Sequence, residues 1–154
     1  MPVKLKTPLS EFDMAIDELT DHAENAVLNT LMYVGESCII EARDNGNYTD
    51  QTGNLRSSIG YVVVKDGEIV RKNVVKEIKD GRSATTQGNS TADSYLKRLA
   101  SDHPKGICLI VVAGMNYAVY VEGRGKNVLS SSELLAERIV PQMLEQLGFI
   151  VRKK

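Results

Sequence analysis

The side chains best suited to catalysis or metal binding are scattered singly along the chain. Its two histidines are His22 and His103, and its two cysteines are Cys38 and Cys108. These residues lack the short spacings of zinc sites, so we expect no metal and no cofactor. We favour two surface histidines and two buried free thiols in a reducing compartment. A disulfide between Cys38 and Cys108 stays an open alternative.

Two short segments imitate catalytic motifs. Ser130-Ser131-Ser132 offers hydroxyl groups, but no histidine is spaced from them in a way that indicates a catalytic pair. Together with Glu133 these serines fit a helix-capping box. Gly123-Arg124-Gly125-Lys126 resembles a fragment of a phosphate-binding loop but lacks the spacing of G-x-x-x-x-G-K-[ST]. We interpret the first segment as a helix start and the second as a flexible basic loop.

Four acidic residues share one face of a predicted helix. Asp13, Asp17, Asp21 and Glu24 follow one another at intervals of four, four and three residues. A solvated helix face is the favoured interpretation. The alternatives are a binding surface for a basic partner or an acidic surface that does not bind DNA phosphates. Paired catalytic carboxylates are the least favoured, because the outer face of an amphipathic helix is not a pocket.

Composition indicates a globular protein. The chain has 154 residues, of which 42% are hydrophobic and 5% aromatic, and its formal net charge is −1. This charge gives no overall attraction to nucleic acid or to an anionic membrane. The N-terminus has no apolar signal core, and no stretch approaches the roughly 20 apolar residues of a spanning helix. We therefore expect a single soluble domain over residues 1–154, in the cytoplasm of the cell that makes it.

A long amphipathic helix is predicted over residues 10–43, after an N-terminal arm at residues 1–9. Apolar residues recur every three or four positions, and Ser10 is a plausible N-cap. Such a helix would be about 50 Å long, whereas a compact domain of this size is about 40 Å across. Either the helix breaks, with Gly35 as the best candidate, or one end packs on another subunit.

The segment that follows, residues 50–59, combines turn-forming and helix-forming residues. Gly53 tolerates unusual backbone angles, and Asp50 can bond nearby backbone N–H groups. Leu55 and Ile59 are apolar anchors four residues apart, which fits one helical turn before a strand. Arg56 places a rigid, planar set of hydrogen-bond donors beside them.

The remaining patterns predict two hairpins and two helices. Strands at 59–64 and 68–78 flank the hairpin signal Asp66-Gly67, and both faces of the first strand are apolar. We further predict a flexible loop at 79–90, a helix at 91–102 and strands at 106–112 and 117–122, followed by a C-terminal helix, a short edge strand at 149–151 and a tail at 152–154. The predicted order is α-β-β-α-β-β-α, an α+β fold with an antiparallel sheet.

Two strings together resemble a known family. They are Asp50-x-Thr52-Gly53-Asn54-Leu55-Arg56-x-Ser58-Ile59 and Asn116-Tyr117-Ala118-x-Tyr120-Val121-Glu122-Gly123. With the long N-terminal helix and the C-terminal helix, they resemble the head–tail joining or tail-completion family of long-tailed bacteriophages and prophages. The resemblance extends from about Phe12 to Leu147, and its first string is the more specific.

The resemblance implies a structural virion protein without enzymatic activity. Members of that family form rings, commonly hexameric, between the tail tube and the head connector. It implies that the chain binds copies of itself, tail tube proteins and head connector proteins, first in the bacterial cytoplasm and then in the virion. It also implies that Arg56, Tyr117, Tyr120 and Glu122 lie at the structural centre, with an ion pair between Arg56 and Glu122 as a plausible contact.

Two other classes of function stay open. A small enzyme or nuclease of a mobile element would need convergent acidic residues or a His–acid pair in a cleft, which the sequence does not assemble. A general nucleic-acid-binding module is disfavoured by the near-zero net charge and by the absence of interleaved aromatic and basic residues. The apolar positions at the ends of the long helix, above all Ile16, are instead expected to form a subunit interface.

Overall fold

The computed structural model describes residues 8–78 and 81–152. Its elements are α1 (Leu9–Asn45), α2 (Asn54–Ser57), β1 (Ile59–Lys65), β2 (Glu68–Val74), α3 (Thr86–Ser101), β3 (Ile107–Ala113), α4 (Ala118–Gly123) and α5 (Ser130–Gln146). The α+β class and the long first helix are therefore confirmed.

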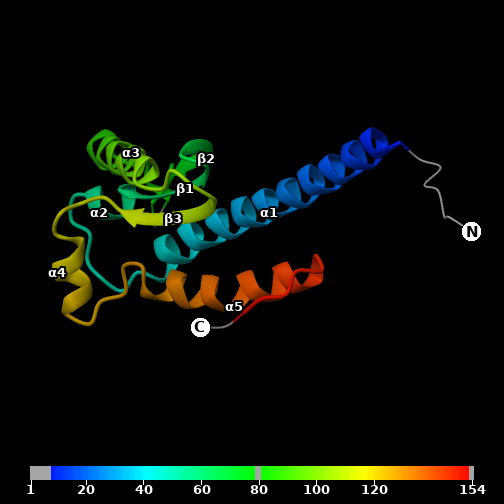
Figure 1. Cartoon of the computed structure of the whole chain (residues 1–154). Coiled ribbons are helices and arrows are strands. Elements are labelled where there is room, and N and C mark those ends of the chain that lie inside the picture. Colours follow the sequence, from blue (N-terminus) through cyan, green and yellow to red (C-terminus); the bar gives the residue numbers. More distant parts are fainter. Residues whose placement is uncertain (1–7, 79–80, 153–154) are drawn as a thin grey trace, which may run out of the picture.

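The sheet is antiparallel, with strand order β2-β1-β3. β1 and β2 form the predicted hairpin, and Asp66 and Gly67 both have positive φ, at 50° and 83°. Two-residue turns with positive φ at both positions match the twist of the strands that they join. α1 lies against one face of the sheet and α3 against the other (Figure 1).

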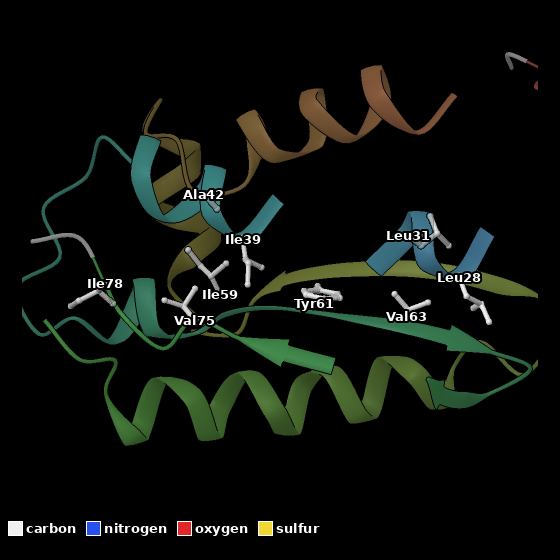
Figure 2. Close-up of a cluster of buried hydrophobic side chains, with 9 residues drawn as sticks. All are labelled: Leu28, Leu31, Ile39, Ala42, Ile59, Tyr61, Val63, Val75 and Ile78. Atoms are coloured by element: carbon white, nitrogen blue, oxygen red, sulfur yellow. The ribbon is translucent and has the colours of Figure 1, made fainter. Parts of the chain in front are cut away.

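The central strand β1 is buried on both faces, as its sequence predicts. Ile59, Tyr61 and Val63 point toward α1, where Leu31 and Ile39 belong to the same cluster (Figure 2). The alternate residues Val62 and Val64 belong to a second cluster with residues of α3. Side chains alternate along a strand, so an uninterrupted apolar strand requires a helix on each face.

α1 does not break at Gly35. It is continuous from Leu9 to Asn45, and at 1.5 Å per residue it is about 55 Å long. Gly35 instead admits the ring of Tyr61, because a Cβ atom on Gly35 would lie 2.4 Å from Tyr61 Cδ2. The Tyr61 hydroxyl then donates a 2.8 Å hydrogen bond to Glu36. The glycine allows close packing of helix on strand rather than a bend.

The N-terminal part of α1 extends beyond the sheet and beyond α5 (Figure 1). Residues from Leu28 onward are buried at intervals, whereas every residue from Leu9 to Asp21 is exposed. This exposed part carries large apolar side chains: Leu9, Phe12, Met14, Ile16 and Leu19.

The second predicted hairpin is wrong. Residues 118–123 form the helix α4 instead of a returning strand, so the sheet has three strands. Ala118 and Val121 are three residues apart and pack in one cluster with Leu55 and Val128. The segment is short and mostly apolar, so its pattern fits a strand as well as a helix, and contacts with the rest of the chain decide between them.

Other predicted boundaries also differ from the structure. α3 begins at Thr86 rather than at residue 91, because Thr85 accepts a hydrogen bond from Gly88 N and acts as the N-cap. Residues 86–90 of the predicted loop are therefore helical. No strand forms at 149–151 in the described chain, and α1 begins after Pro8 without the predicted Ser10 cap. Residues 1–7 of the arm, 79–80 of the loop and 153–154 of the tail lie outside the described residues.

Candidate functional site

The turn at residues 50–58 is held by hydrogen bonds from its own side chains. One carboxylate oxygen of Asp50 accepts from Gly53 N at 3.0 Å and the other from Arg56 N at 2.8 Å, which fixes the start of α2. Gly53 has φ 77°, a conformation that favours glycine. The predicted helical turn with built-in hydrogen-bond partners is confirmed. We call residues 50–58 the central turn.

The central turn also anchors α3. Ser57 Oγ donates to Gly53 O at 2.6 Å and accepts from Thr85 N at 2.8 Å. Thr85 Oγ1 donates to Asn54 Oδ1 at 2.7 Å. α3 approaches so closely that a Cβ atom on Gly88 would lie 2.5 Å from Ser57 Cβ. Residues of the central turn thus position α3, the helix that covers one face of the sheet.

Arg56 closes the C-terminal end of α1. The residue is 4% exposed; its Nη2 donates to Gly46 O at 2.8 Å and its Nε to Arg43 O at 3.3 Å. The last carbonyls of a helix lack partners within the helix and carry its negative dipole end, so a cation satisfies both requirements. The guanidinium also lies over the ring of Tyr48, 4.4 Å from its centroid. Burial raises the pKa of Tyr48 to about 12.

Glu122 has an equivalent role at the start of α5. It accepts hydrogen bonds from Ser130 N at 2.8 Å and Leu129 N at 3.1 Å, and also from the Ser130 hydroxyl. Partial burial acts to raise the pKa of Glu122, but these donors outweigh it and hold the pKa below its ordinary value. The predicted capping box of Ser130 is therefore replaced by a distant carboxylate on α4.

The proposed ion pair between Arg56 and Glu122 is not formed, since the described ion pairs do not include it. The two side chains cap different helices. Asn127 bridges the same two helices, because Nδ2 donates to Asn45 O at the end of α1 while Oδ1 accepts from Ser131 N of α5. Arg56, Glu122 and Asn127 therefore connect the ends of α1 and α5 to other parts of the chain.

The other predicted site residues lie in three places. Gly53 and Leu55 belong to the central turn, and Leu55 is buried in the cluster that contains Ala118. Tyr117, just before α4, is 36% exposed; burial and the nearby Asp50 raise its pKa. Tyr120, on α4, is 74% exposed. Ile16 belongs to the exposed N-terminal part of α1, which lies far from α2 (Figure 1).

Sequence reasoning missed a hollow of about 710 Å³ between α3 and the start of α4. Its lining includes Tyr95, Arg98, Met115, Asn116 and Val119. No sequence pattern indicated it, because the segment 117–122 was expected to be a strand. We call it the α3–α4 groove.

Within 8–78 and 81–152, no three or more His, Cys, Asp or Glu side chains are grouped so that they could hold a metal ion. None of the described helices combines the length and the apolar composition needed to cross a membrane. Cys38 and Cys108 are both free thiols.

Comparison of the chain with protein-family models, with curated proteins and with solved structures gives no match.

Proposed function

We propose that this protein is a structural component of the head–tail junction of a long-tailed bacteriophage or prophage. In this proposal it forms or completes a ring between the tail tube and the head connector. It is made in the cytoplasm of the bacterial host and ends in the virion. Support comes from the resemblance of the two strings around Gly53 and Tyr117 and from the shape of the molecule.

The observation that carries the proposal is the exposed part of α1. Phe12, Ile16 and Leu19 lie on one helix face and are 56%, 46% and 69% exposed. Contiguous apolar side chains that face solvent mark interaction surfaces in folded proteins. A contact between this part of α1 and a different surface of the next copy is head-to-tail, and repetition of such a contact closes a ring when the rotation fits.

The test is the mass of the assembly. Native mass measurement over a range of protein concentrations is expected to show closed oligomers for the natural chain, and electron microscopy is expected to show rings. Ile16→Asp places a charge in the apolar face and should abolish assembly. Ile150→Asp, at a position that is 93% exposed and lies outside the helices, is the matched control and should leave assembly intact.

Two results would refute the proposal. One is a chain that stays monomeric at high concentration, both alone and with tail and connector proteins. The other is an Ile16→Asp variant that assembles as well as the natural chain while its circular dichroism is unchanged.

A further inference from the structure

The α3–α4 groove and the exposed part of α1 have complementary chemistry. The exposed part of α1 has apolar residues and acidic ones, and no basic residue occurs between Leu9 and Asp21. The opposite end of the molecule, around the groove, has apolar and basic residues. We infer that the N-terminal part of α1 of one copy docks in the α3–α4 groove of the next copy. This inference rests on the proposed ring and identifies its contact.

The acidic side chains in the exposed part of α1 form no ion pair among the described residues. Glu24 forms an ion pair with Lys65, whereas no ion pair within residues 8–78 and 81–152 involves the acidic residues before it. These acidic residues are Glu11, Asp13, Asp17, Glu18 and Asp21. Like charges at helical spacing repel one another, so a basic neighbour would remove a cost that the lone chain carries.

One cation, Arg98, lines the groove, and two more follow α4. Arg98 lies over the ring of Tyr95, 4.7 Å from its centroid, and Arg124 and Lys126 follow α4 on an exposed segment. None of these three cations pairs with a carboxylate in the described part of the chain. Of the carboxylates near them in sequence, Asp93 pairs with Lys72 and Lys97, and Glu122 caps α5. Asp102, four residues after Arg98, forms no ion pair among the described residues.

The groove also offers apolar surface to the apolar side chains of α1. Val119 is 77% exposed, and it lines the groove with Tyr95 and Met115. On the other side, Phe12, Ile16 and Leu19 form a stripe with the spacing by which an amphipathic helix enters an apolar groove. The exposed apolar residues of the two surfaces would then cover one another.

The dimensions agree with this contact. α4 is about 9 Å long and residues 9–24 of α1 are about 24 Å long, so one docked helix can reach both the groove and Arg124. α4 and the N-terminus of α1 lie at opposite ends of the molecule (Figure 1). A chain therefore cannot fill its own groove with this helix, and the contact must join two copies.

Cross-linking tests the contact directly. Ile16→Cys and Val119→Cys are each made in a Cys108→Ser background, which leaves buried Cys38 as the other thiol. A short bifunctional thiol reagent should join the two variants only when they are mixed. Ile150→Cys mixed with Val119→Cys is the matched control and should give at least tenfold less product.

Charge reversal tests the electrostatic part. Arg98→Glu with Arg124→Glu should weaken self-association by about tenfold or more, because it places like charges across the contact. Asp13→Lys with Asp17→Lys, mixed with that variant, should restore association. Raising the salt concentration should weaken the contact between natural chains, because exposed charges are screened.

The possible failures are distinguishable. If rings form and need Ile16 but no Ile16–Val119 cross-link appears, this inference is wrong and the proposed function stands. If charge reversal leaves association unchanged, the assignment of the groove is likewise wrong. If the chain never assembles, even with tail and connector proteins, both the inference and the proposed function are overturned.

Discussion

The carboxylate of Glu122 accepts a hydrogen bond from the backbone N–H of Ser130 at 2.8 Å, across eight residues of sequence. A helix N-terminus leaves its first N–H groups without partners, and here the partner comes from another helix rather than from the residue before α5. The start of α5 is thereby tied to α4.

Removing this cap should destabilise the fold. Glu122→Ala is expected to lower the free energy of unfolding by about 1 kcal/mol, the usual effect of losing a helix cap. Urea denaturation measures the loss. Glu133→Ala, which removes a carboxylate within α5 itself, is the control and should have a smaller effect. An equal loss in the two variants would contradict the assigned role.

Glu122 should also make stability depend on pH. Its pKa is lower in the folded chain than its ordinary value, so its contribution is present at neutral pH and is lost as pH falls through the folded-state pKa. Glu122→Gln should flatten this acid limb of the stability curve relative to the natural chain. Lys72 and Lys97 also lower the pKa of Asp93. The stability of both the natural chain and the variant should therefore still fall somewhat as pH decreases. Parallel curves for the two proteins would refute the prediction.

Arg56 should not tolerate lysine. A lysine ammonium cannot donate to the carbonyls of Arg43 and Gly46 while stacking on Tyr48, so a buried carbonyl loses its partner. We expect Arg56→Lys to cost about 2 kcal/mol of unfolding free energy, the scale of a hydrogen bond to a charged group. Arg43→Lys makes the same change at a side chain that is 30% exposed and should cost less than about 0.5 kcal/mol. Thermal unfolding of both variants provides the comparison.

Gly35 should resist even a methyl group. A Cβ atom there would lie within 2.7 Å of three atoms of the Tyr61 ring, so Gly35→Ala is expected to cost about 1–3 kcal/mol by overpacking, despite the better helix propensity of alanine. Gly123→Ala in α4 meets no atom within 4 Å and is the control. In a Tyr61→Val background the cost of Gly35→Ala should shrink. An unchanged cost would show that ring contact is not its cause.

The two parts of α1 should differ in local stability. The part from Leu28 to Ala42 has buried residues at intervals, whereas Leu9 to Asp21 is exposed throughout. Few tertiary contacts imply easy local opening, so amide hydrogens of residues 12–21 should exchange much faster than those of 31–42 in the monomer. Ring formation should slow the exchange of the first group. Equal protection of both parts in the monomer would contradict the prediction.

Local patterns were sufficient for much of the fold. The long stripe of α1, the apolar strand β1 and the Asp66-Gly67 turn are properties of consecutive residues, so the sequence identified them. The same holds for the central turn, in which Asp50 and Gly53 act within a few residues of each other. Each of these features depends on neighbours that the sequence itself displays.

Tertiary structure decided the features that depend on distant partners. Residues 117–122 are mostly apolar and were predicted to form a strand, but Ala118 and Val121 pack in one cluster with Leu55, and residues 118–123 are helical. Gly35 suggested a break in α1, but in the folded chain the Tyr61 ring packs directly against this glycine and the helix is continuous. Arg56 and Glu122 suggested an ion pair, yet each finds backbone groups of a helix end. Sequence displays which groups need partners, whereas only the folded chain selects among the partners available at long range.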